Sequence, residues 1–207
     1  MSSRKEREWR FRRQLLADTA SDLFHQHTYE KVTMQDIATA AECGKATLYQ
    51  YFSSKEEILG FVLTGAQKDL LAQLELACDG SQPVFSELHT YIQLQYQFYL
   101  HYGPLIISMM KRKLEGTLNP DLFREAFAYR TRKLDLLAEV LQRGIDLHLL
   151  VNMDSHKLAR VLHNIIRGFS LEIMESGQSN RDPQNDIELI AQVLSNGILI
   201  RGEETAK

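Results

Sequence analysis

The polar side chains of residues 33–55 are the part of this sequence best suited to chemistry, because hydroxyl, amide and ammonium groups are concentrated there. Such groups donate hydrogen bonds to phosphate oxygens and to the exposed edges of nucleic-acid bases. The segment reads Thr-Met-Gln-Asp-Ile-Ala-Thr-Ala-Ala-Glu-Cys-Gly-Lys-Ala-Thr-Leu-Tyr-Gln-Tyr-Phe-Ser-Ser-Lys. The pattern indicates nucleic-acid recognition rather than bond-making chemistry.

Two short helices joined by a tight break must position these groups. Thr33 and Asp36 predict a capping box at the start of the first helix, where a hydroxyl takes an orphan amide and a carboxylate lies in the first turn. A small apolar face beginning at Ile37 then lets two short helices cross closely. We expect the break at residues 41–44, with Gly44 as turn residue or as N-cap of the next helix.

The second short helix is expected over residues 45–51. Leu48 and Phe52, four residues apart, form its inward face and leave its polar side chains pointing outward. A Ser-x-x-Glu cap at Ser54 opens the next helix. A helix, a turn and a second helix with basic and polar groups is an arrangement that enters the major groove of DNA.

The run Lys-Ala-Thr-Leu-Tyr-Gln-Tyr-Phe-Ser-Ser-Lys at residues 45–55 resembles the hallmark of the TetR family of bacterial transcriptional regulators, Lys/Arg-Gly-Thr-Leu/Phe-Tyr-x-His-Phe-x-Ser-Lys. Chain length and helix order also fit that family. Ala46 stands where glycine is common, and Tyr51 where histidine is common. The sequence Glu42-Cys43-Gly44 replaces a typical Gly-Val-Ser, so the turn glycine is displaced and an acid lies near the expected DNA face.

The resemblance implies a division of labour on DNA, in which phosphate contacts position the protein and base contacts specify the sequence. By resemblance, phosphates are expected at Thr33, Tyr49, Tyr51 and Lys55. The candidates for base edges are Gln35, Lys45, Thr47 and Gln50. Ala46 is short enough to let the helix backbone approach the DNA closely.

The composition is that of an ordinary globular protein, because 44% of the 207 residues are hydrophobic, 25% are charged and the formal net charge is −3. The N-terminus is locally basic, with Arg4, Lys5, Arg7, Arg10, Arg12 and Arg13 against the acids Glu6 and Glu8. Such an arm suits phosphates, although a solvated tail is the alternative interpretation.

Cysteine usage and hydropathy place the protein in the cytoplasm. Cys43 and Cys78 lack C-x-x-C spacing, which argues against a metal knuckle or a disulfide scaffold. The start lacks the apolar region of a signal peptide, and no uncharged apolar run approaches the roughly 18 residues of a membrane span. We therefore expect no membrane partner, no metal site and no cofactor.

Helical periodicity continues to the end of the chain and predicts an all-α fold of about nine helices. We expect a three-helix DNA-binding domain with its basic arm at residues 1–54, and a helical ligand-sensing and dimerisation domain at residues 55–207. Breaks between helices are expected near residues 79–83, at Gly103-Pro104, and at Asn119-Pro120.

The last two predicted helices, over about residues 157–176 and 183–200, are apolar over a wide arc, so they need packing partners on both sides. The end of a chain of this size does not easily supply both partners. We therefore predict that the pair packs on its twin in a four-helix homodimer interface, as the family resemblance also implies. The predicted interface residues are Leu162, Ile166, Phe169, Ile173, Ile190, Leu194 and Ile198.

The middle helices are rich in aromatic side chains, which either line an adaptable apolar cavity or simply fill the core. The candidate cavity residues are Tyr91, Phe98, Tyr99, Met109, Phe127, Tyr129 and Phe169. Three polar side chains on these apolar helices, Arg130, His163 and Arg167, are candidates to anchor a carboxylate or a phosphate. Pairing with Glu172 or a place at the dimer seam are their alternatives. A cationic ligand would instead require a buried carboxylate such as Glu87 or Glu125, and periodicity places neither inside.

Enzyme signatures are missing from the sequence, which contains no H-E-x-x-H, no glycine-rich phosphate loop and no G-x-S-x-G. The sequence instead predicts a non-enzymatic, ligand-responsive transcriptional regulator. By the usual sense of the family it is a repressor, released from a palindromic double-stranded operator by a small apolar or amphipathic effector. The alternative from another class is a helical adaptor that binds proteins and not DNA.

Overall fold

The structure, a computed structural model, describes residues 4–176 and 182–198, and within these ranges the side chains of residues 173–176 and 194–198 are not described. The elements are α1 (Arg4–Gln26), α2 (Met34–Ala40), α3 (Lys45–Tyr49), α4 (Lys55–Ala77), α5 (Val84–Leu114), the 3₁₀ turn η1 (Pro120–Phe123), α6 (Arg124–Asp146), α7 (Ser155–Ser176) and α8 (Pro183–Ile198). The predicted all-α fold is confirmed. The described part of the chain has eight α-helices where about nine were predicted.

The difference in helix count arises at Gly103-Pro104, where a break was predicted. α5 instead continues through Pro104 to Leu114. A proline inside a helix removes one backbone hydrogen bond, here to Leu100, and costs about 3 kcal/mol. Tyr99 and Leu105 on either side of the proline are almost completely buried, so packing of the flanking turns outweighs the local cost.

The helices gather into two compact units that are not continuous in sequence. Unit 1 contains Met1–Gln67 and Pro104–Phe127, whereas unit 2 contains Lys68–Gly103 and Ala128–Lys207. Helices α4, α5 and α6 therefore contribute residues to both units. The predicted division after residue 54 stays a prediction. None of the described helices combines the length and hydropathy needed to cross a membrane.

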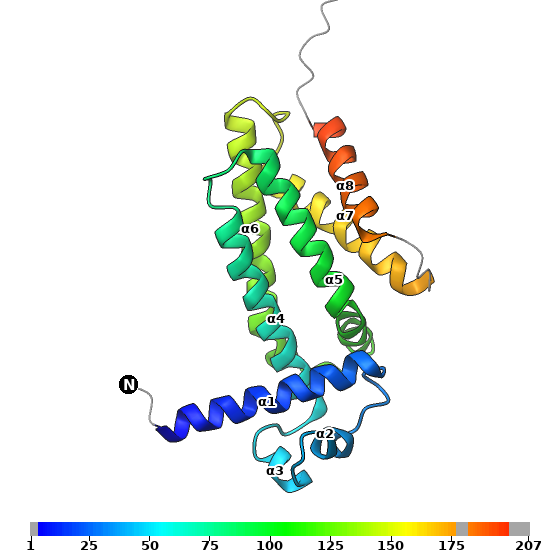
Figure 1. The fold of residues 1–207 in the computed structure, drawn as a ribbon. Helices are drawn as coiled ribbons and strands as arrows, with labels where there is room; N and C mark the ends of the chain where they lie inside the picture. The colour runs from blue at the N-terminus through cyan, green and yellow to red at the C-terminus, as the bar shows by residue number, and fades with distance from the viewer. Residues whose placement is uncertain (1–3, 177–181, 199–207) are drawn as a thin grey trace, which may run out of the picture. The chain divides into compact units, whose positions relative to one another are not determined.

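The core of unit 1 forms where α1 meets α2 and α3 (Figure 1). Leu16, Ala20 and Phe24 lie on the buried face of α1, and Leu15 is 54% exposed, which resolves the two helix phases that the sequence allowed. Ile37 of α2 and Leu48 of α3 are fully buried in the same unit. The apolar face of α2 is therefore short but completely covered.

The end of α5 and the η1 turn pack against the start of α4 in unit 1. The backbone N–H of Asn119 donates to Oε1 of Glu56 at 2.9 Å, and Arg112 forms an ion pair with the same carboxylate at 3.3 Å. A Cβ atom on Gly60 would lie 2.5 Å from the carbonyl oxygen of Leu122. Glycine is therefore required at position 60, because a side chain there would push η1 away from α4.

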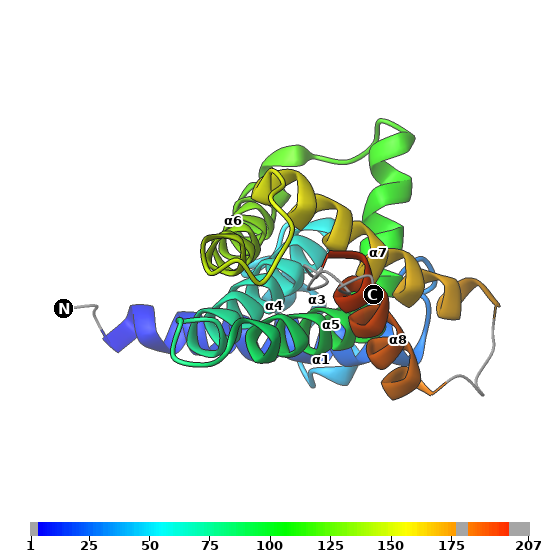
Figure 2. The ribbon, with the colours of Figure 1, turned by 90° about the horizontal axis from the view of Figure 1, so that it is seen from above.

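Unit 2 is built around the aromatic half of α5, with α7 and α8 side by side (Figures 1 and 2). Tyr96 of α5 donates its hydroxyl hydrogen to the buried carboxylate of Asp186 on α8. Leu162 of α7 and Ile190 of α8 are also buried. A buried hydrogen bond of this kind fixes the position at which α8 packs along α5.

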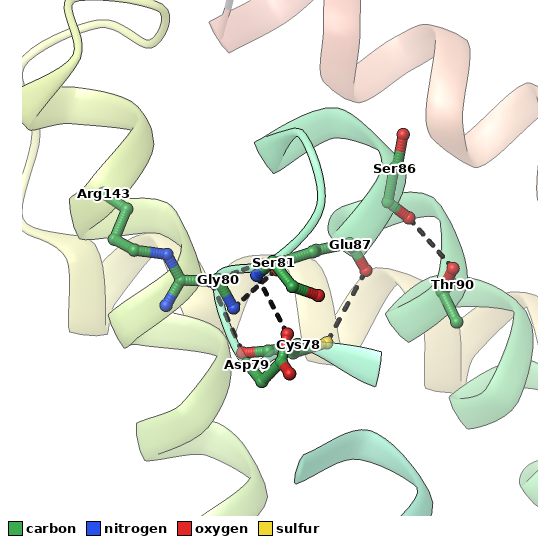
Figure 3. A network of polar contacts seen from close by, with 8 residues as sticks. All are labelled: Cys78, Asp79, Gly80, Ser81, Ser86, Glu87, Thr90 and Arg143. Atoms are coloured by element: carbon green, nitrogen blue, oxygen red, sulfur yellow. Dashed lines mark hydrogen bonds and ion pairs between the residues drawn. The ribbon is translucent and has the colours of Figure 1, made fainter. Parts of the chain in front are cut away.

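A closed polar network ties the α4–α5 turn to α6 (Figure 3). Glu87, whose side chain is fully buried, accepts from the N–H of Gly80 at 2.7 Å and forms an ion pair with Arg143. Arg143 also donates to the carbonyl oxygen of Cys78. Gly80 has a φ of +88°, a conformation that favours glycine. The sequence did not place Glu87 inside, and the structure buries it with its partners.

Removing the arginine should expose the cost of that buried carboxylate. We expect Arg143→Ala to lower the free energy of unfolding by roughly 2 kcal/mol, because the buried carboxylate of Glu87 loses its ion-pair partner. The value is below the range for a fully buried pair because the Arg143 side chain is 36% exposed. Urea unfolding measures the change. Arg132→Ala, in an exposed pair with Glu139, is the control and should change stability by less than about 0.5 kcal/mol; equal losses in the two variants would contradict the assignment.

Candidate nucleic-acid interface and effector site

The predicted capping box holds the start of α2. The N–H of Asp36 donates to Oγ1 of Thr33 at 3.2 Å, and the N–H of Thr33 donates to the Asp36 carboxylate at 2.8 Å. These hydrogen bonds from Thr33 lower the pKa of Asp36 below its usual value. Thr33 and Gln35 are exposed at this helix start, as expected for side chains that meet DNA, although the side-chain and N–H groups of Thr33 already serve the cap.

The turn between α2 and α3 contains a left-handed residue, and that residue is Glu42 with a φ of +49°. The N–H of Cys43 donates to the carbonyl of Ala38 and the N–H of Glu42 donates to that of Thr39, which is the pattern of a Schellman motif. Gly44 has a φ of −70° and is the N-cap of α3. The position that favours glycine is thus occupied by glutamate, and the glycine serves as a cap.

α3 presents a polar outer face on a buried base. Leu48 and Phe52 are 0% and 1% exposed, as predicted. The DNA candidates Lys45, Ala46, Tyr49 and Gln50 are exposed, and Thr47 and Tyr51 are half-buried. The helix ends at Tyr49 rather than at the predicted Tyr51. The side chains predicted to contact bases are therefore accessible to solvent, while Leu48 and Phe52 anchor the opposite face of the helix in the core.

Arg13, which the sequence placed in the basic arm, is instead part of the structure of unit 1. Its guanidinium lies 4.8 Å from the ring centre of Phe52 and 4.6 Å from that of Phe61, and it pairs with Glu57 at 2.7 Å. Trp9 of α1 also stacks on Tyr51, with ring centres 5.7 Å apart. The arm is helical from Arg4 onward, so its other cations lie along the surface of α1.

Lys55, which was predicted to contact phosphate, makes its hydrogen bonds within unit 1. Its ammonium donates to the carbonyl oxygens of Tyr29 and Val32, both at 2.7 Å, and to that of Glu30 at 3.4 Å. It also lies 4.3 Å from the ring centre of Tyr29. An ammonium has three N–H donors, and all three are used here. Partial burial lowers the pKa of Lys55. In this structure Lys55 ties the connection between α1 and α2 to the start of α4.

The predicted effector residues fall into both units. Met109 and Phe127 belong to unit 1, and the others belong to unit 2. Within unit 2, Tyr91, Phe98, Tyr99 and His163 are buried, whereas Tyr129, Arg167 and Phe169 are half-buried. Arg130 is exposed. At the start of α6 the buried face is therefore rotated away from Arg130, which the sequence analysis placed on an apolar helix as a candidate anchor.

That rotation brings a lysine inside, and the sequence analysis missed it. Lys133 is only 1% exposed and donates to Oε1 of Gln95, itself fully buried, at 3.3 Å. Burial, together with the nearby charge of Arg130, lowers the pKa of Lys133 to about 7. Leu136 and Leu137 follow Lys133 at helical spacing, and that pattern could have revealed its place.

A histidine from α7 meets the same aromatic helix. The hydroxyl of Tyr99 lies 2.9 Å from Nε2 of His163, and the two rings meet edge to face. Burial, followed by the charges of Arg130, Lys133 and Arg167, lowers the pKa of His163 to about 3. Burial also raises the pKa of Tyr99 to about 12. Both side chains are therefore neutral near pH 7.

Of the four predicted dimer residues whose side chains the structure describes, three lie inside the protomer. Leu162, Ile166 and Ile190 are buried in the core of unit 2, whereas Phe169 is half-buried. The predicted Ile173, Leu194 and Ile198 lie outside the side chains that the structure describes. Among the side chains of α7 and α8 that the structure describes, the large apolar ones that are exposed are Val161, Leu189 and Val193. Among the described residues, no group of three or more His, Cys, Asp and Glu side chains could hold a metal ion.

Comparison of sequences finds relatives for the region that contains the α2–turn–α3 unit. Residues 16–60 match the model of bacterial regulatory proteins of the tetR family. The chain is 31% identical over 78 residues to the uncharacterized HTH-type transcriptional regulator YhgD of Bacillus subtilis, and 32% identical over 80 residues to the HTH-type transcriptional regulator TcmR of Streptomyces glaucescens. These alignments cover 38% and 39% of this chain, and 41% and 35% of the relatives.

Comparison of folds extends the likeness over nearly the whole chain. A Saccharomonospora viridis protein in complex with choline aligns with a TM-score of 0.80 at 20% identity, covering 91% of this chain and 98% of that one. The TetR family transcriptional regulator PfmR of Thermus thermophilus gives 0.72 at 22%, covering 87% and 97%. The fatty acid degradation regulator FadR of Bacillus halodurans gives 0.73 at 17%, covering 90% and 95%. At sequence identities this low, the structural similarity shows a shared fold and nothing more.

The left-handed glutamate in the turn gives a stability prediction. We expect Glu42→Gly to raise the free energy of unfolding by roughly 0.5–1 kcal/mol, because glycine adopts a φ of +49° without the clash of a Cβ atom. Glu42→Gln removes the charge but keeps the Cβ atom, and should change stability by less than about 0.5 kcal/mol. Thermal and urea unfolding of the two variants measure the difference. A gain of the same size in both would assign the effect to charge instead of backbone.

The hydrogen bonds of Lys55 give a second prediction. Lys55→Met keeps an apolar stem over Tyr29 and removes the three donors, so the free energy of unfolding should fall by roughly 2 kcal/mol. Lys31→Met, at an exposed lysine of the same connection, is the matched control and should leave stability unchanged within about 0.5 kcal/mol. If Lys55→Met weakened DNA binding and left the free energy of unfolding unchanged, that result would contradict the structural role and support the predicted phosphate contact.

Proposed function

We propose that this chain, whose residues 16–60 match the model of bacterial regulatory proteins of the tetR family, belongs to that family and is a cytoplasmic DNA-binding transcriptional regulator that responds to a small molecule. The observation that carries the proposal is the α2–turn–α3 unit. Its second helix is anchored through Leu48 and Phe52 and presents Lys45, Tyr49 and Gln50 to solvent. A rigid helix with an exposed polar face is what entry into a major groove requires.

On the proposed function, α3 reads bases and the start of α2 helps to position it. Lys45 can donate to guanine, Gln50 can pair with adenine, and the methyl group of Thr47 can contact thymine. Tyr49, with 47% of its surface exposed, and Tyr51 can donate their hydroxyl hydrogens to phosphates. Lys55 is left out of this set because its donors are used within unit 1.

We propose that the regulator works as a homodimer through α7 and α8. Val161, Leu189 and Val193 give these helices an exposed apolar face. A Cβ atom on Gly168 would meet no atom within 4 Å, so the backbone of α7 is also open to close approach there. A two-fold dimer would read a palindromic operator with half-sites roughly 34–36 Å apart.

The proposed control is a change of half-site spacing caused by an effector bound in unit 2. By linkage, an effector that favours a spacing unsuited to the operator lowers DNA affinity, and DNA lowers effector affinity by the same factor. Repression relieved by the effector is the proposed sense of regulation. Among proteins with this fold, one was solved with choline and another regulates fatty acid degradation, so a cation and a carboxylate are the two chemistries to separate.

Selection of bound duplexes from a randomised library, with purified effector-free protein at moderate salt, tests this proposal. Recovery of an inverted repeat would support both sequence-specific DNA binding and dimeric reading. Recovery of a single half-site would keep DNA recognition and remove the dimer. If no DNA is retained at low salt by folded protein, the regulator proposal fails and the adaptor is the better interpretation.

Substitutions on α3 should weaken binding to the selected operator in two distinguishable ways. Lys45→Ala should lower affinity about 10-fold or more and relax preference at one base pair, because it removes a base contact. Tyr49→Phe should weaken binding to all sequences alike, because it removes a phosphate contact. Fluorescence anisotropy over a range of salt concentrations measures both effects. Lys68→Ala, at an exposed lysine of α4 in unit 2, is the control and should bind as the parent protein does.

A further inference from the structure

A set of polar side chains is buried among the aromatic rings of unit 2. It consists of Gln95 and Tyr99 from α5, Lys133 from α6 and His163 from α7, and we call it the buried polar cluster. Each of these residues has a relative exposure of 4% or less. Phe98 connects the set, since its ring centre lies 4.7 Å from the ammonium of Lys133 and 5.7 Å from the ring centre of Tyr99. Polar groups this deep are normally fully hydrogen-bonded.

In the part of the chain that the structure describes, two nitrogen atoms of the buried polar cluster lack hydrogen-bond partners. Nε2 of Gln95 and Nδ1 of His163 have no partner among the described residues. Lys133 has Oε1 of Gln95 as its hydrogen-bond acceptor. If the hydroxyl of Tyr99 donates to Nε2 of His163, the neutral imidazole carries its hydrogen on Nδ1 as a further donor. The cluster therefore has more donors than acceptors, and a group rich in acceptors would complete it.

The charges that act on the cluster have the same sign. Arg130 and Arg167 act on Tyr99 and on His163, and Arg130 also acts on Lys133. The buried carboxylates of Glu87 and Asp186 in unit 2 already have partners, because Glu87 pairs with Arg143 and Asp186 accepts a hydrogen bond from Tyr96. A bound anion would thus enter a region of positive potential, whereas a cation would meet Lys133 at the face of the aromatic ring.

We propose that the buried polar cluster binds the carboxylate of an apolar organic acid, with Lys133 as its counter-ion and Gln95 and His163 as hydrogen-bond donors. This inference rests on the proposed function in treating that acid as the effector. The apolar part of the acid would lie against the rings of Phe98 and Tyr99. Aromatic surface with a few convergent polar groups is the usual composition of a small-molecule site.

Binding of the acid also involves a proton. Burial and Arg130 lower the pKa of Lys133 to about 7, so a large share of the unliganded protein holds a neutral amine near that pH. An ion pair needs the ammonium form. The proton arrives with the undissociated acid or is taken from solvent, and no other bond forms or breaks. His163 does not compete for it, because its pKa is lowered to about 3.

Thermal unfolding of the full chain with a matched set of probes tests the site without DNA. The probes are carboxylates from hexanoate to dodecanoate and a set of aromatic acids, each with its primary amide, together with choline and octyltrimethylammonium. We expect at least one acid to raise the Tm of the wild-type protein, and we expect its amide and both cations to leave the Tm unchanged. Lys133→Met should fold, since it removes a buried charge, and should bind that acid at least about 10-fold more weakly. Lys157→Met, at an exposed lysine of α7, should bind as wild type does.

Calorimetry in two buffers of different ionisation enthalpy gives a readout that a purely structural lysine would not change. Between about pH 7 and pH 9, binding of the acid should be accompanied by uptake of protons by the wild-type protein and not by Lys133→Met. Preferential binding of a cation or an amide, full acid binding by Lys133→Met, or failure of every acid to bind would each overturn the proposal. These outcomes are independent of DNA, so the operator selection judges the proposed function separately.

Discussion

A helix of only five residues such as α3 is not stable by itself in water, because nucleating a helix costs more free energy than one turn of hydrogen bonds returns. The position of α3 is therefore set entirely by contacts outside it. Leu48 and Phe52 bury its base, and the guanidinium of Arg13 covers the rings of Phe52 and Phe61 while pairing with Glu57 at the start of α4. One side chain of α1 thus links the residue that anchors α3 to the helix that follows it, which makes the α2–turn–α3 unit part of a packed body rather than a loop.

The chain buries charge in two contrasting ways in unit 2. Glu87 has a counter-ion and a backbone donor, so its network is closed and its role is to join the α4–α5 turn to α6. Lys133 has a single amide oxygen as acceptor and an aromatic face, so its network is open. An open network costs stability, because a buried amine without a counter-ion resists protonation. Local violations of this kind are expected where a protein keeps a site for something else.

The sequence predicted most of the local structure of the α2–turn–α3 unit and few of the polar contacts made by buried side chains. The capping box at Thr33 and the buried Leu48 and Phe52 follow from interactions within four residues, so spacing alone predicted them, whereas spacing left Gly44 as either a turn residue or an N-cap. The roles of Arg13 and Lys55 could not, because their partners are 44 and 26 residues away. Spacing also placed Arg130, and not Lys133, among the apolar side chains of α6. Arg130 and Lys133 are one turn apart on similar faces, and packing against α5 and α7 decided which is buried.

The continuity of α5 through Pro104 bears directly on how the proposed control would work. This helix carries Gln95 and Tyr99 in unit 2, and it carries in unit 1 the Arg112 that pairs with Glu56 beside Lys55. A break at Pro104 would have made the two ends independent. A continuous helix with one missing backbone hydrogen bond is stiff along its axis and weaker in bending at that point. An acid bound beside Gln95 and Tyr99 would therefore act on a helix that continues without a break into unit 1, and Pro104 is the point at which that helix bends most easily.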